Sequence, residues 1–350
     1  MNAPATGATG PSPGGPFRCS VAAQRRGDEL AGTASTVSAF LLMEEPGPWG
    51  IDAWRDARLP DGLGLEVLRR SAATGVKALL IRRPAMGRGH PASAGAPGRR
   101  VFAAYVTADG GWVESGQLTD PREVLDLDLA ALRAGRSVGL SPWPEPIFAV
   151  CTHGRHDPCC AERGRPVALA IAEAEPEAAW ASSHLGGDRF AANLLVLGAG
   201  LYYGGLDEQS ARRVVAAHRA GRLDLEHLRG RTCWPMSVQA AEIGLRRHLQ
   251  LTPWGGVRLV TRQPVAGGEP GTATVEVRFA VADPGVAGGT ASDAPFAGLD
   301  QWVVSVRRRA GAPVALTCHA RRRQPLTRWD VVGCRPAADD VSPVRPETCG

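Results

Sequence analysis

Residues 147–174 decide the fold of this chain, and they read IFAVCTHGRHDPCCAERGRPVALAIAEA. The first five are apolar and predict a buried strand that ends at Cys151, followed by a polar loop over 153–158. A helix is then predicted from about Cys160 to Ala174. Two cysteines therefore flank one loop, and the second lies at a helix start, where unpaired N–H groups stabilise a thiolate.

The chain downstream of this stretch continues the same unit. A short strand over 179–183 and a hairpin formed by 191–197 and 201–205 are expected next. Helices are predicted over 208–220, with Asp207 as N-cap, and over 237–250. The order β-α-β-β-α at this size is typical of a thioredoxin-like unit.

The chain upstream predicts the order β-α-β-β-β-α. Asp120 is a candidate N-cap because Pro121, at the first helical position, lacks the N–H that would be unpaired there. The predicted elements lie at residues 34–43, 63–75, 76–81, 101–107, 112–117 and 121–134.

The chain beyond Leu251 changes its pattern. Val275, Val277, Phe279 and Val281 alternate with polar residues, as in a half-buried strand. We therefore predict an α/β fold with a mixed α+β sheet, in which a thioredoxin-like domain precedes a small antiparallel β appendage. The expected divisions are a disordered tail 1–18, an N-terminal section 19–146, the thioredoxin-like domain 147–251, a β-rich section 252–335 and a tail 336–350. Further short strands are expected at 301–307, 314–317 and 328–332, and a loop at 283–298.

Composition narrows the function classes. The 350 residues carry 40 Lys+Arg and 35 Asp+Glu, a net charge of +5, and only 5% are aromatic, so nucleic-acid binding is not expected. No apolar run of about 18 residues exists, which predicts no transmembrane helix. The first residues lack the pattern of a secretory signal, which predicts a cytoplasmic protein without a disulfide framework.

A second polar segment follows the predicted strand 179–183 and reads SSHLGGDRFA over 182–191. Its Gly-Gly pair permits unusual backbone angles, and both His184 and Asp188 can coordinate a metal. A tight turn with a capping Asp is the alternative interpretation. For the cysteines, ordinary packing or a redox pair competes with metal binding, and the spacing is not that of a zinc finger.

These two segments resemble the sucrase/ferredoxin-like family, a branch of thioredoxin-like ferredoxins. The sequence segments that carry the resemblance are FAVCTHGRHDPCCAERGRPVA and SSHLGGDRFAANLLVLGAGLYYGGL. It extends back to GTASTVSAFLLMEEPGPWG and forward to RTCWPMSVQAAEIGLRRHL, from about Cys19 to Cys318. The resemblance implies a 2Fe–2S cluster held by two cysteines and two histidines.

The ligand set that the resemblance implies is incomplete here. Cys151 and Cys160 match the family's Cys-x8-Cys spacing, and His184 matches its first histidine, but Asp188 stands at the second. Asp188 either ligates the cluster or orients His184 through a hydrogen bond. Cys159 or Cys233 are the alternative fourth ligands.

The resemblance implies an electron carrier rather than an enzyme. Imidazole ligands raise the cluster potential to about −150 to +300 mV, and an exposed ligand histidine makes it depend on pH. A metal-free thiol redox protein and a binding protein that has lost its cluster are the alternatives. The arginines near the site are expected either to meet an acidic redox partner or to form an ordinary solvated surface. His153 and His156 are expected to be solvated. Those arginines are Arg155, Arg163, Arg165 and Arg189.

Overall fold

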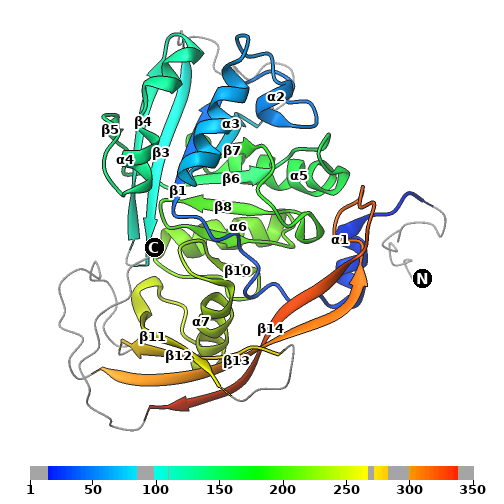
Figure 1. The fold of residues 1–350 in the computed structure, drawn as a ribbon, viewed down its shortest axis with the longest axis vertical. Coiled ribbons are helices and arrows are strands. Elements are labelled where there is room, and N and C mark those ends of the chain that lie inside the picture. The colour runs from blue at the N-terminus through cyan, green and yellow to red at the C-terminus, as the bar shows by residue number, and fades with distance from the viewer. Residues whose placement is uncertain (1–14, 85–97, 109, 267–271, 283–298, 338–350) are drawn as a thin grey trace, which may run out of the picture.

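Two β-sheets organise the chain, which a computed structural model describes over residues 15–84, 98–108, 110–266, 272–282 and 299–337. The large sheet has ten strands in the order β10-β9-β8-β6-β7-β2-β1-β3-β4-β5, with parallel and antiparallel neighbours. The small sheet is antiparallel, in the order β11-β12-β13-β14. The predicted mixed α/β class is therefore confirmed (Figure 1).

The described elements follow in chain order. The strands are β1 (Ala39–Glu44), β2 (Lys77–Arg82), β3 (Arg99–Thr107), β4 (Gly110–Leu118), β5 (Ser141–Pro142), β6 (Ile147–Cys151), β7 (Ala179–Ser182), β8 (Leu194–Leu197), β9 (Leu201–Tyr203), β10 (Leu228–Arg231), β11 (Val257–Val265), β12 (Thr274–Val281), β13 (Asp300–Val314) and β14 (Gln324–Pro336). The α-helices are α1 (Cys19–Arg26), α2 (Ala53–Asp56), α3 (Leu63–Thr74), α4 (Leu129–Arg133), α5 (Pro158–Ala174), α6 (Glu208–Arg219) and α7 (Met236–Leu249). Short 3-10 turns are η1 (Pro121–Asp126), η2 (Asp188–Phe190) and η3 (Trp254–Gly256).

The N-terminal section contains the predicted elements, but one predicted helix is divided, and α1, α2 and β5 were not predicted. Residues 121–134 form η1 and then α4, rather than one continuous helix. Leu127 is extended between them, and the side chain of Asp128 accepts hydrogen bonds from two backbone N–H groups to start α4 anew. A second good N-cap thus competes with helix continuation. The predicted cap at Asp120 forms a capping box.

Residues 147–251 contain the predicted strands and helices, but their full order is β6-α5-β7-β8-β9-α6-β10-α7, and β10 was not predicted. β6 pairs with β7 in parallel and with β8 antiparallel, and β9 lies beyond β8. Helix α5 begins at Pro158, two residues before the predicted start, because Asp157 caps it by accepting a hydrogen bond from Cys159 N. The description of this unit as thioredoxin-like stays a prediction.

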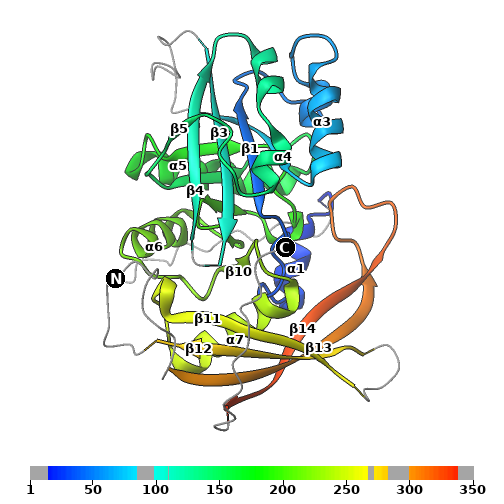
Figure 2. The same ribbon diagram turned by 60° about the vertical axis from the view of Figure 1, so that its left-hand side comes forward.

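The two sections share one sheet, because β2 of the first pairs with β7 of the second through Ile81 and Ser182. The small sheet lies at the end of the molecule opposite α3, with α7 against it (Figures 1 and 2). In that sheet 314–317 is not a separate strand, because β13 runs on to Val314 and pairs with β14. The predicted loop 283–298 and most of both predicted tails lie outside the described residues.

The described helices include none that is both long and apolar enough to cross a membrane.

Candidate metal centre

Cys151, Cys160 and His184 come together at the carboxyl ends of β6 and β7, two central strands of the large sheet. Cys151 ends β6, His184 follows the parallel neighbour β7, and Cys160 lies in the first turn of α5. Their thiol and imidazole atoms all lie within 4.8 Å of one another. Both cysteines are buried, whereas the His184 side chain is 31% exposed. The three residues that the sequence singles out therefore form one group able to bind a metal.

A glycine allows α5 to approach β6 closely enough for this arrangement. A Cβ at Gly164 would lie 2.0 Å from the carbonyl oxygen of Cys151. Only a residue without a side chain fits there. The start of α5, and with it Cys160, is thereby held against the end of β6.

Asp188 completes the group from the segment after His184. Its Oδ1 lies 3.0 Å from Nδ1 of His184 and 3.4 Å from the thiol of Cys160, which donates to it. When His184 is protonated, this contact is an ion pair between the buried carboxylate and the imidazolium. Asp188 therefore orients His184 and also offers an oxygen atom to the same group.

The Gly186–Gly187 turn that carries His184 to Asp188 is fixed from behind by a buried arginine. Both glycines have positive φ, and a Cβ at Gly187 would lie 2.4 Å from the guanidinium of Arg229. Arg229 donates to the carbonyl of Gly186 and to the side chain of Asn193, at 3.0 and 2.8 Å. Asn193 in turn donates to the carbonyl of Gly187. The Gly186–Gly187 pair therefore allows Arg229 to pack closely against this turn.

His156 is the residue that sequence reasoning missed. Its ring stacks on that of His184 at a centroid distance of 3.8 Å, and its Nε2 lies 4.0 Å from Oδ2 of Asp188. His156, His184 and Asp188 form a second set of ligand atoms within 4.8 Å of one another. The sequence feature that could have identified His156 is its place in the short loop between Cys151 and Cys160, which are both candidate ligands.

His153 was expected to be solvated, and that expectation is wrong, because the residue is 3% exposed. Its Nε2 lies 2.9 Å from the carbonyl of Gly50, and its ring stands edge-on to Trp49. It also lies beside the His156 ring, at a centroid distance of 5.6 Å. His153 thus connects the loop to the N-terminal section.

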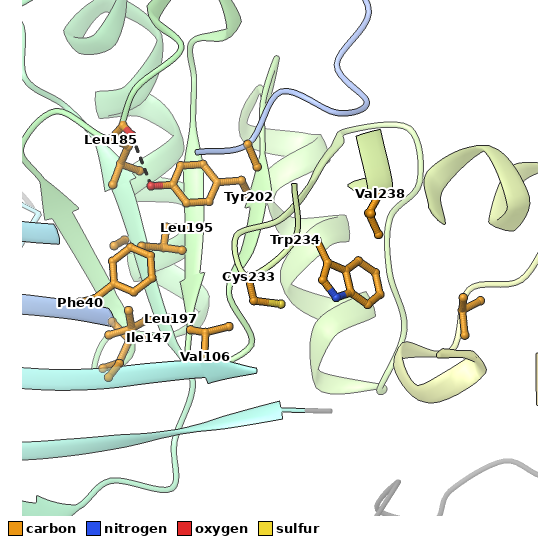
Figure 3. Close-up of a cluster of buried hydrophobic side chains, with 14 of the residues drawn as sticks. Phe40, Val106, Ile147, Leu185, Leu195, Leu197, Tyr202, Cys233, Trp234 and Val238 are labelled. Atoms are coloured by element: carbon orange, nitrogen blue, oxygen red, sulfur yellow. Dashed lines mark hydrogen bonds between the residues drawn. The ribbon is translucent and has the colours of Figure 1, made fainter. Parts of the chain in front are cut away.

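The two alternative cysteines lie outside this group. Cys159 faces away from Cys160 and joins Cys19 and Cys318. Cys233 lies in the apolar core beside Trp234 (Figure 3). Over the described residues, Cys233 belongs to none of the sets of converging ligand atoms.

The electrostatics of the group favour one thiolate beside one imidazolium. The neighbouring Cys160 thiol is the main cause that holds the pKa of Cys151 well below its ordinary value, against the effect of burial. The proximity of Cys151, together with burial, raises the pKa of Cys160. Burial would lower the pKa of His184, but the contacts with Asp188 and Cys151 outweigh it and raise that pKa to about 9.

The carboxylate of Asp188 balances this pair. Burial would raise the pKa of Asp188, but its contact with His184 holds the pKa below its ordinary value. The negatively charged Cys151 thiolate and Asp188 carboxylate thus both contact the positively charged His184 imidazolium. A metal ion takes the place of protons on such ligands, so the group could hold a metal.

Comparison with known proteins gives one match. The model of the family described as sucrase/ferredoxin-like matches residues 30–230, which is more than half of the chain and includes all the residues of this group. No curated protein and no solved structure matches the chain. The chain belongs to the sucrase/ferredoxin-like family.

Proposed function

We propose that this chain is an electron-transfer protein that holds a 2Fe–2S cluster through Cys151, Cys160, His184 and Asp188. The observation that carries the proposal is the convergence of two buried cysteine sulfurs and one imidazole, whose ligand atoms all lie within 4.8 Å of one another. The family membership supports the same conclusion.

The donor set fits such a cluster. Thiolate and imidazole are the ligands that proteins use for 2Fe–2S centres, with two imidazoles on one iron in the Rieske type. Asp188 supplies an oxygen where a second imidazole would stand, and carboxylate is an uncommon ligand. Its distances to His184 and Cys160 nonetheless leave it in the same group of side chains. His156, whose ring stacks on that of His184, is the competing fourth ligand.

The bound cluster would supply reversible one-electron chemistry, and the protein would control its exposure. Cys151 and Cys160 are buried, so their sulfurs are shielded from water and oxidants. His184 and His156 have side chains 31% and 37% exposed and form the solvent-facing side of the group. Electrons would therefore enter and leave on the histidine side.

The burial of both sulfurs weighs against the metal-free alternative. A thiol that exchanges with a substrate disulfide must be reached by that substrate, so reactive cysteines are partly exposed. Cys151 and Cys160 are 1% and 0% exposed, despite the lowered pKa of Cys151. A thiolate in this position is better suited to a metal than to a protein substrate.

The expected redox partner is acidic where it meets this side. Arg155, in the same loop as His156, and Arg165, on α5, are both exposed. Complementary charge guides a partner to such a surface and speeds association. We therefore place partner docking over the loop 153–158 and the exposed edge of His184.

Pulsed electron paramagnetic resonance on the anaerobically reconstituted, reduced protein tests the ligand set. We expect a 2Fe–2S signal with hyperfine coupling to an imidazole nitrogen, which selective ¹⁵N-histidine labelling should shift. In His184→Cys that coupling should disappear while the iron remains. A reduced cluster without nitrogen coupling in the wild-type protein would contradict His184 as a ligand.

A further inference from the structure

Three cysteines and one aspartate form a second group next to the candidate cluster site. Cys19 opens α1, Asp157 and Cys159 stand at the start of α5, and Cys318 lies in the connection between β13 and β14. Their ligand atoms all lie within 4.8 Å of one another. We call these four residues the Cys19 group. Figures 1 and 2 both show α1 beside the β13–β14 connection.

The sulfurs of the Cys19 group are close without being bonded. Sγ of Cys318 lies 3.3 Å from Sγ of Cys159 and 3.6 Å from Sγ of Cys19. Sγ of Cys19 lies 3.7 and 3.8 Å from the two carboxylate oxygens of Asp157. A tetrahedral zinc site with Zn–S bonds of about 2.3 Å has sulfur–sulfur edges of about 3.8 Å. The observed separations are close to that value.

The surroundings of Asp157 are the observation that points to a cation ligand. The residue is 0% exposed, and its partners over the described chain are two backbone N–H groups and the thiol of Cys19. No ion pair with Arg, Lys or His joins it there. A buried carboxylate is normally paired with a positive group or coordinates a metal. Each oxygen accepts one N–H, from Cys159 and from Cys318, and the remaining lone pairs face the Cys19 thiol, whose proton a metal ion would replace.

The backbone also prepares the sulfurs for a metal. The N–H of Cys19 points at Sγ of Cys318, at 3.4 Å, and hydrogen bonds of this kind stabilise ligating thiolates. Cys159 lies within the first turn of α5, where the helix dipole favours a negative charge. Both features suit thiolates that lose their protons to a bound ion.

We propose that the Cys19 group is a structural zinc site, with Cys19, Cys159 and Cys318 as thiolate ligands and Asp157 as the fourth ligand. Four protein ligands without an open position are typical of structural rather than catalytic zinc. The site would join three segments that lie far apart in the sequence: α1, the start of α5 and the tip of the small sheet. Because Cys160 follows Cys159 directly, zinc would also fix the helix turn that presents Cys160.

Metal binding by the full-length Cys151→Ser/Cys160→Ser variant tests this proposal, because that variant lacks the candidate cluster ligands. The reduced variant should bind one Zn²⁺ per chain by elemental analysis. With Co²⁺ in place of Zn²⁺ it should show thiolate-to-metal charge-transfer and tetrahedral visible bands. Adding Cys318→Ser should weaken zinc binding by more than about 100-fold, above the loss typical of an outer-shell partner. Adding Cys334→Ser, a thiol of β14 outside both groups, should change nothing.

A third variant protects the test against simple misfolding. Cys318→His, in the same background, keeps a zinc ligand and should bind Zn²⁺ more tightly than Cys318→Ser does, with both having the same circular dichroism spectrum. Absence of zinc and cobalt binding in the reduced double variant would overturn the proposal. Zinc binding unchanged by Cys318→Ser, or a Cys159–Cys318 disulfide in place of metal binding, would also overturn it. Iron content plays no part in this readout, so failure of the cluster proposal is a separate result.

Discussion

Cys159 and Cys160 are adjacent in α5, yet their thiols join different groups of side chains. Cys160 donates to Asp188, whereas Cys159 lies 3.3 Å from Cys318. Neighbouring residues on a helix point about 100° apart, so one helix turn can serve two sites. The pair at the start of α5 is therefore the point at which the candidate cluster site and the Cys19 group meet.

Replacing Cys159 and Cys160 by serine one at a time should show that each cysteine belongs to a different metal site. Cys160→Ser should abolish cluster retention, because it removes a buried thiolate from the group of Cys151 and His184. Cys159→Ser should keep the iron and lose the zinc. Iron and zinc analysis of the same two samples gives both answers. Loss of iron in Cys159→Ser with retention in Cys160→Ser would reverse the assignment.

Replacing Asp188 identifies the fourth ligand. Asp188→His should keep the cluster and raise its midpoint potential, because a neutral imidazole replaces an anionic carboxylate. Asp188→Ala should lower iron retention. His156→Ala is the matched control and should leave the iron content unchanged. If His156→Ala loses iron while Asp188→Ala retains it, the fourth ligand is His156.

Gly164→Ala tests the close approach of α5 to β6 without touching a ligand. The added Cβ would meet the carbonyl of Cys151 at 2.0 Å, so α5 must move away from the strand. Overpacking of this kind costs about 1–3 kcal/mol. We expect a lower midpoint in denaturant unfolding and faster loss of iron, because Cys160 moves with the helix. Unchanged stability and iron retention would show that the approach is not required.

Buried His218 should make stability fall with acid. It lies on α6 between Phe148 and Trp254, and burial lowers its pKa to about 4. Below pH 6.5 the unfolded chain takes up a proton that the native protein refuses until about pH 4. The free energy of unfolding should therefore drop across this window by up to about 3 kcal/mol.

His218→Phe removes this titrating group while keeping an aromatic ring in place. Its stability relative to wild type should rise as the pH is lowered from 7 to 4, measured by urea unfolding at each pH. An identical pH dependence in the two proteins would show that His218 does not titrate as described.

Helices and strands that depend on residues close together in the sequence could be predicted. The strand ending at Cys151, the cap at Asp207 and the hairpin of β3 and β4 follow from apolar runs, capping residues and turn residues close in sequence. The helix predicted over 121–134 failed because Asp128 competes as a second cap. Asp120 and Asp128 can both begin a helix, and periodicity alone does not show that the helix starts anew at the second.

Contacts between distant segments lay beyond such reasoning. Cys19 and Cys318 are 299 residues apart, and nothing near either one indicates that the fold brings them together. His156 differs, because its loop position was visible, but its stacking on His184 depends on how β6 and β7 end side by side. The convergence of Cys151, Cys160 and His184 was predictable because the spacing matched a known pattern.

The central claim is that Cys151, Cys160 and His184 hold a 2Fe–2S cluster, and an anaerobic iron and sulfide assay with a visible spectrum tests it most directly. The account predicts a brown protein with about two iron and two acid-labile sulfide per chain, bleached by reduction, and a colourless Cys151→Ser variant. A wild-type protein that stays colourless and free of iron after anaerobic reconstitution would contradict it.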